Sequence, residues 1–65
     1  MKLRMIREAK SIGLNQLANK VGVTGTYLSY LERGLRNNPS KEVMEKIAEA
    51  LNETVPSIFY PEEVV

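Results

Sequence analysis

Residues 14–34 read LNQLANKVGVTGTYLSYLERG, and the spacing of their apolar side chains decides the fold of this chain. Leu17 and Val21 are one helical turn apart, and Leu28 and Leu31 have a similar separation further along. Each pair would lie on one face of a short helix, because side chains three or four residues apart are neighbours on a helix surface. The two faces can pack against each other, so the segment predicts a pair of short helices.

The junction between these helices contains residues suited to a tight turn. Ala18 is small enough to let another helix cross closely, and Gly22 suits the left-handed backbone often found just past a helix end. The hydroxyl of Thr24 can cap a following helix that begins at Gly25. The segment therefore predicts a helix-turn-helix.

Three further helices are predicted outside this segment. Leu3, Ile6 and Ala9 are spaced to face a core from the first of them. Ser40 can cap a helix with a broad apolar stripe, and Thr54 can cap a short last helix. The five expected helices cover residues 2–10, 14–21, 25–33, 41–51 and 55–59.

A chain of 65 residues allows one domain with a small core. We expect one all-α domain over residues 1–65, with residues 60–65 as a C-terminal tail. Cysteine and histidine are absent, so disulfides, the commonest metal ligand and the commonest general base are excluded. We therefore expect no enzyme activity, no metal and no cofactor. No apolar run approaches a membrane span and the N-terminal segment is charged, so we expect a cytoplasmic protein with no membrane contact.

Charge is distributed unevenly along the chain. Residues 1–36 contain seven Lys or Arg and two Glu, whereas residues 37–65 contain two Lys and six Glu. The basic half could face a polyanion such as DNA while the acidic half faces away. The alternative is a solvated surface on which the charges are segregated by chance.

These patterns together resemble the phage-repressor and Cro superfamily, also called the Xre family of bacterial helix-turn-helix regulators, and in particular its Sin-like subtype. The matching residues are Gly22-Val23, Tyr27-Leu28-Ser29, Leu31-Glu32-Arg33 and Asn38-Pro39-Ser40. The likeness extends over roughly residues 2–59. The chain departs from the family at Gly13, where Ser or Thr is usual, and at Leu14, where Gln is frequent. The resemblance implies a five-helix, lambda-repressor-like domain that binds operator DNA and represses, or less often activates, transcription.

The resemblance also implies where DNA is bound. In this motif the start of the second helix enters the major groove, and the loop after that helix meets the sugar-phosphate backbone. Tyr27 lies beside the core stripe, where its phenol can donate a hydrogen bond to a phosphate. The expected DNA-binding residues are Thr24, Gly25, Thr26, Tyr27, Ser29, Tyr30, Arg33, Arg36, Asn37 and Asn38.

Several of these residues also have a simpler explanation. Thr24 could serve only as a helix cap, and Tyr30 could belong partly to the core. Arg33 could only complement the charge at the end of its helix. Lys10 and Lys20 could graze phosphates or could only improve solubility.

Four residues are expected to have structural roles. Two are Ala18 and Gly22 at the turn. The others are Arg7 and Glu32, since the resembling fold pairs an arginine of the first helix with a glutamate near the end of the third. Such a pair matters for stability only when it is partly buried.

We expect a homodimer formed through the C-terminal part. Ile58, Phe59 and Tyr60 are three large side chains in a row, and one short helix cannot turn all of them toward the core. Two copies would then bind a pseudo-palindromic operator. The alternative is that Phe59 closes the monomer core and the tail frays. The expected interface consists of Ile58, Phe59, Tyr60, Val64 and Val65.

A second class of function is a protein-interaction module, such as an antitoxin or a partner controlled by an antirepressor, because a fold does not determine a function. A basic first half with an accessible second helix favours DNA. An unidentified regulatory protein is a further expected partner. The activity could also be controlled by the concentration of the protein or by its proteolysis.

Overall fold

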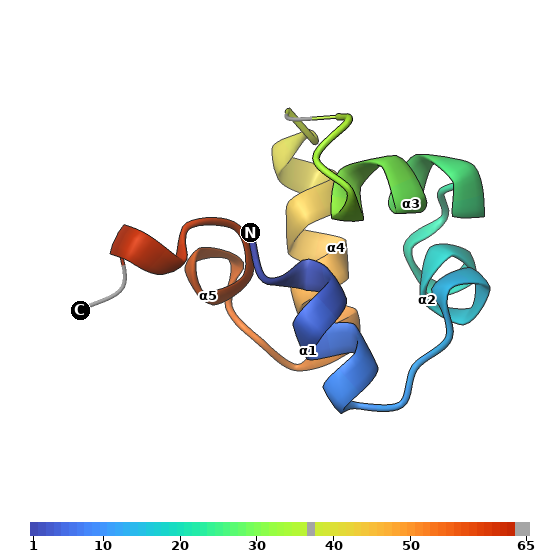
Figure 1. Ribbon diagram of the computed structural model, residues 1–65, viewed down its shortest axis with the longest axis horizontal. Coiled ribbons are helices and arrows are strands. Elements are labelled where there is room, and N and C mark those ends of the chain that lie inside the picture. Colours follow the sequence, from blue (N-terminus) through green and yellow to red (C-terminus); the bar gives the residue numbers. More distant parts are fainter. Residues whose placement is uncertain (37, 64–65) are drawn as a thin grey trace.

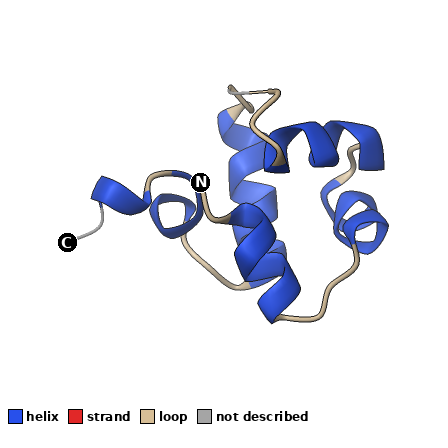
Figure 2. Cartoon of the chain, in the orientation of Figure 1, coloured by secondary structure: helices blue, strands red, loops and turns tan. Residues whose placement is uncertain are grey.

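The computed structural model describes residues 1–36 and 38–63, which form five α-helices and no strand (Figures 1 and 2). The predicted all-α, five-helix class is confirmed. The helices are α1 (Leu3–Ala9), α2 (Leu14–Val21), α3 (Gly25–Glu32), α4 (Lys41–Leu51) and α5 (Val55–Phe59), followed by a 3-10 turn, η1 (Pro61–Glu63).

Side-chain caps begin three of the helices, as their sequences predict. The hydroxyl of Thr24 accepts a hydrogen bond from the amide of Tyr27 at 3.0 Å, which satisfies a donor that the first turn leaves unpaired. Ser40 does the same for α4, and Thr54 for α5. Gly13 has no side chain to offer α2. Instead, the side chain of Gln16 accepts a hydrogen bond from the Gly13 amide at 3.2 Å.

Helix α4 lies in the middle of the molecule, with α2 and α3 toward one end of the long axis and α5 toward the other (Figure 1). The helix-turn-helix packs on itself and on α4 through the apolar faces predicted for α2 and α3. Gly22 adopts a φ of 86°, the left-handed backbone expected at the turn between them. The buried apolar side chains are Leu3, Leu17, Ala18, Val21, Leu28, Leu31, Ile47, Ala48, Leu51 and Ile58.

The predicted core face of α1 is partly wrong. Leu3 is buried and Ile6 packs against the core, but Ala9 is exposed. A helix has turned through about 240° after six residues, so Ala9 lies far round the helix from Leu3. Arg7, four residues after Leu3, is on the buried face instead.

The predicted C-terminal surface also requires correction. Ile58 is fully buried in the monomer core, and its carbonyl accepts a hydrogen bond from the amide of Lys2 at 2.7 Å. The start of α1 therefore lies against α5, and Ile58 is unavailable to a second copy. Phe59 is half-buried against the core and Tyr60 is exposed. Val64 and Val65 lie outside the described residues.

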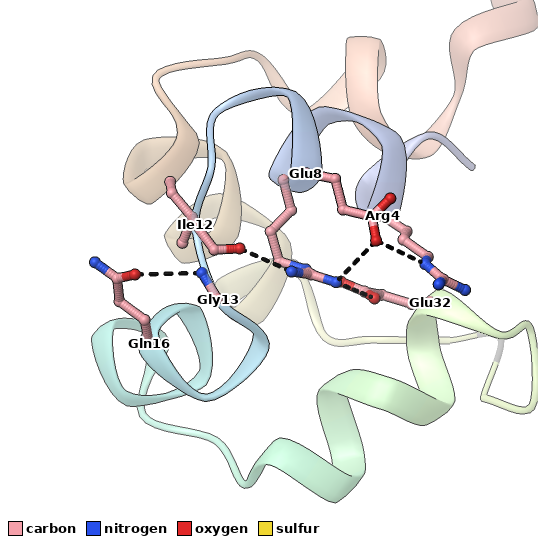
Figure 3. A network of polar contacts seen from close by, with 7 residues as sticks. Arg4, Glu8, Ile12, Gly13, Gln16 and Glu32 are labelled. Atoms are coloured by element: carbon pink, nitrogen blue, oxygen red, sulfur yellow. Dashed lines mark hydrogen bonds and ion pairs between the residues drawn. The ribbon is translucent and has the colours of Figure 1, made fainter.

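The buried Arg7 holds three parts of the chain together through its bonds to Glu32 and Ile12, both of which are labelled in Figure 3. Its guanidinium donates from Nε to one carboxylate oxygen of Glu32 at 2.6 Å and from Nη2 to the other at 3.1 Å. Its Nη1 donates to the carbonyl of Ile12 at 2.7 Å. The two charged side chains are only 11% and 5% exposed. The contact expected between Arg7 and Glu32 is thus present, and it connects α1, the segment before α2 and the end of α3.

The Arg7 guanidinium keeps its positive charge throughout the physiological pH range. The hydrogen bonds with Glu32 raise the pKa of Arg7 above its ordinary value, against the opposing effect of desolvation. The guanidinium therefore stays protonated wherever the protein is folded, and the pair is sensitive to loss of the carboxylate rather than to loss of a proton from the arginine.

Glu32→Gln should destabilise the fold by about 3 kcal/mol, because it leaves the buried Arg7 charge without its partner. Thermal and urea unfolding would measure the loss. Glu8→Gln is the matched control, since Glu8 lies 4.0 Å from Arg7 but its side chain is 55% exposed. This control should cost less than about 1 kcal/mol. Equal unfolding midpoints for Glu32→Gln and the unsubstituted protein would contradict the structural role of the pair.

Candidate nucleic-acid interface

Helix α3 buries one face and leaves the other free. Leu28 and Leu31 are fully buried. Thr26, Tyr30 and Arg33 are exposed, and their spacing of four and three residues puts them on one side of the helix. Polar or amphipathic groups thus form a continuous row on the side of α3 away from the core. Ser29, half-buried, is beside this row.

The two tyrosines of α3 differ in their surroundings. Tyr27 was expected off the core stripe, but it is half-buried and its ring packs against the core. It lies four residues before Leu31, so it is close to the buried side of the helix. Tyr30, for which a partial core role was an alternative, is 38% exposed. An aromatic ring packed at its base with a polar tip is suited to hold a hydroxyl at a fixed place on a surface.

Thr24 is the N-terminal cap of α3, the structural role considered for it as an alternative to DNA contact. Its hydroxyl oxygen caps α3, yet the residue is exposed and its hydroxyl hydrogen is still available to a ligand. Gly25 follows at the first position of the helix. The space beside Gly25 is occupied by the amide oxygen of Asn15, which a Cβ atom at position 25 would overlap.

The loop after α3 presents two arginines. Gly34 adopts a φ of 76°, which ends the helix, and the amides of Leu35 and Arg36 both donate to the carbonyl of Tyr30, at 2.8 and 3.3 Å. These bonds fold the loop back against the end of α3. Arg33, Arg36 and Asn38 are exposed there, and Asn37 lies outside the described residues.

In the part of the chain that the structure describes, ion pairs engage three cations of the first half and leave the two arginines of this loop free. On α1 and just after it, Arg4 pairs with Glu8 at 3.2 Å, Arg7 with Glu32, and Lys10 with Glu53 at 3.7 Å. No carboxylate among the described residues lies within ion-pair distance of Arg33 or Arg36. The unpaired positive charge in the described part of the first half is therefore divided between Arg33 and Arg36 at this loop and Lys2 and Lys20 elsewhere, and Lys10 is drawn toward the acidic half.

Among residues 1–36 and 38–63, no three Asp or Glu side chains are grouped closely enough to hold a metal ion. None of the helices in this part of the chain has the length and apolar character needed to cross a bilayer. Every buried side-chain nitrogen or oxygen atom that the structure describes has a hydrogen-bond partner, so none is left aimed at a buried ligand.

Sequence reasoning missed two residues at the start of α2. Gln16 caps the helix, and its position three residues after Gly13 is the signal that could have found it. Asn15 lies against Gly25, the first residue of α3, and no spacing within the sequence of either helix predicts this contact.

A model of the family described as Helix-turn-helix matches residues 3–58 of the chain. The chain belongs to the helix-turn-helix family. It is 37% identical over 58 residues to the HTH-type transcriptional regulator SinR of Bacillus subtilis (strain 168), and the match covers 89% of this chain and 52% of that protein. The chain spans about half the length of the curated relatives that it matches.

Two solved structures are similar in fold and sequence. One is described as the crystal structure of SinR, a master regulator for biofilm formation, in complex with DNA. It aligns with 83% of this chain and 86% of its own chain, with a TM-score of 0.78 and 39% identity. The other is a complex of the SinR and SinI proteins, which covers 95% of this chain and 60% of its own, with a TM-score of 0.86 and 34% identity. These matches confirm the predicted repressor-type fold and the resemblance to the Sin-like subtype.

Proposed function

We propose that residues 1–65 form one DNA-binding domain of a transcriptional regulator, most simply a repressor, that recognises a specific operator in bacterial or phage DNA. One observation carries this proposal: the exposed, polar and cationic side of α3 and its loop belongs to a fold that aligns with DNA-bound SinR at 39% identity. Since its target is DNA in the cytoplasm, we place the protein there. The proposed activity is binding, and it needs no catalytic group, metal or cofactor.

In the proposed complex α3 lies in the major groove. Thr26, Ser29 and Tyr30 are placed to contact base edges, where hydroxyl groups can donate or accept and the Thr26 methyl can meet thymine. Thr24 and Gly25 lie at the end of the helix that enters first.

Backbone contacts surround these base contacts. The hydroxyl of Tyr27, held by its packed ring, is suited to donate to a phosphate oxygen. Arg33 and Arg36 supply the positive charge of the loop, together with Asn38 and, outside the described residues, Asn37. Contacts of this kind fix the register of the protein on the duplex and provide most of the sequence-independent affinity.

A homodimer would bind a pseudo-palindromic operator. Helix α5 and the turn η1 lie at the end of the molecule opposite α2 and α3, so a second copy could bind there without covering α3 (Figure 1). Tyr60 is 42% exposed and Phe59 half-buried, and both are available at this end. We propose that they form the contact together with the remainder of the tail at residues 60–65, with Ile58 supporting it only from within the core.

A protein partner is a second candidate function. It is supported by the alignment of 95% of this chain with a structure of SinR bound to SinI. A regulatory protein could act on this domain directly or on other parts of a longer protein. This candidate is compatible with DNA binding, and loss of DNA binding on addition of the partner would link the two.

Arg36→Ala should weaken binding to all DNA sequences alike and lower the slope of log affinity against log salt concentration by about 1, because one phosphate contact is lost. Fluorescence anisotropy with a random-sequence duplex at several salt concentrations would measure this. Lys46→Ala is the control: it removes the same charge from α4, where Lys46 pairs with Glu42 at 3.2 Å, and should barely change the slope. Salt-independent binding by the unsubstituted protein would refute the proposed function.

Thr26→Ala and Ser29→Ala should instead change which sequences are preferred. Loss of a hydroxyl contact should cost about 1–3 kcal/mol at one operator position and little at the others. Selection of bound sequences from a random duplex pool, followed by affinities for single base-pair variants, would show this. An equal loss across all variants would assign these residues to positioning on the backbone.

Deletion of residues 60–65 should convert a dimer into a monomer and reduce binding to a full operator far more than binding to a half-site. Half-site centres should be about 34–36 Å apart, or a multiple of this. Sedimentation at micromolar concentration would give the mass, and thermal unfolding would check that the shortened chain still folds. A monomer mass for the unshortened chain, with no effect of the deletion, would exclude this dimer.

A further inference from the structure

Gly25 is a glycine whose backbone does not require one. Of the four glycines, only Gly22 and Gly34 have a positive φ, the conformation that other residues adopt at a cost. Gly25 begins α3 with ordinary helical entry geometry, where glycine is a poorer helix former than alanine. The structure therefore uses the space that the missing side chain leaves.

That space is filled from the other helix of the motif. A Cβ atom at Gly25 would overlap the side-chain oxygen of Asn15 and lie 3.4 Å from its Cγ. The space beside the other three glycines is more open. The nearest atom to a Cβ at Gly13 would be 3.9 Å away, and nothing lies within 4 Å of a Cβ at Gly22 or Gly34. The carboxamide of Asn15 thus takes the place of a side chain at position 25.

Asn15 remains open to solvent while it makes this contact. It is the second residue of α2 and is exposed, so its packing against Gly25 does not bury it in the core. Gly25 precedes Thr26, the first residue of the exposed row on α3. The carboxamide accordingly lies beside the end of α3 that the proposed function places in the major groove.

We propose that Asn15 is a sequence-determining residue that recognises an adenine through its carboxamide, in place of a side chain at position 25. An asparagine carboxamide can accept from N6 and donate to N7 of adenine, and no other base presents this pair of groups in the major groove. The inference rests on the proposed DNA-binding function. It makes Gly25 a positioning residue, since its role is to leave room for Asn15.

This arrangement predicts that two substitutions on different helices have the same effect. Asn15→Ala removes the carboxamide, whereas Gly25→Ala keeps it but forces it out of its place. Each variant should lose the preference for an A·T pair at the same position of each half-site, by about tenfold in affinity relative to the other base pairs. The double variant should lose no more than either single variant, because both substitutions remove one contact.

The experiment uses the full chain and a random-sequence double-stranded DNA pool. Bound sequences are selected for the unsubstituted protein, the two single variants, the double variant and Asn19→Ala, and affinities are then measured for single base-pair variants of the selected duplex. Asn19→Ala is the matched control: it removes the same exposed carboxamide one turn along α2, away from Gly25, and should change no preference. Thermal unfolding of every variant checks that the fold is intact.

Each result supports or overturns the inference. Loss of the same A·T preference in both single variants, without additivity, supports it. A uniform loss over all sequences in Asn15→Ala, with a lower salt slope, would mean a phosphate contact and overturn it, as would unchanged preferences or additive losses at different positions. If the unsubstituted protein binds no duplex, the proposed function fails as well. Binding with preferences independent of Asn15 refutes only this inference.

Discussion

The buried ion pair between Arg7 and Glu32 is the constraint on which the placement of α1 against the helix-turn-helix depends. Helix α1 is only seven residues long and has one fully buried apolar side chain, Leu3, so apolar packing alone defines its position poorly. The guanidinium supplies what is missing, because its planar donors fix both the distance and the orientation of the groups that accept from it. Two of its bonds hold the end of α3 and a third holds the backbone at Ile12, directly before α2. The guanidinium of Arg7 therefore positions both α2 and α3 relative to α1. Such a pair adds little net stability over an apolar one, but its disruption leaves a buried charge without a partner.

The same pairing pattern shapes the electrostatic surface. Carboxylates neutralise the cations of α1 and Lys10, one of them reaching across from the acidic half of the chain at Glu53. Arg33 and Arg36, at the end of α3, are left to act on solvent and on any polyanion. At the opposite end of the molecule Tyr60 is exposed and Phe59 is half-buried. The free arginines and these aromatic side chains thus lie at different ends of a molecule whose net charge is only +1.

The glycines illustrate how one residue type serves two physical purposes. Gly22 and Gly34 allow left-handed backbone at the ends of α2 and α3, and that need can be inferred from their place just past an apolar repeat. Gly25 allows a side chain from another helix to approach, and that need depends on how α2 and α3 cross. A substitution at Gly25 would therefore act on the surface of the motif through Asn15, whereas one at Gly22 would act on the turn itself.

The sequence by itself determined the five helices and most of their ends, because these depend on interactions between residues three or four positions apart. The cap at Thr24 is an example: hydroxyl and amide are neighbours along the chain, and their meeting requires only that a helix begin there. Only the tertiary structure decided that Ile58 is buried rather than offered to a second copy, and that Asn15 occupies the space beside Gly25. These contacts join residues on different helices. These contacts depend on the angle and distance at which the helices pack. That geometry results from the packing of the whole core and cannot be predicted from the residue spacing of any one segment.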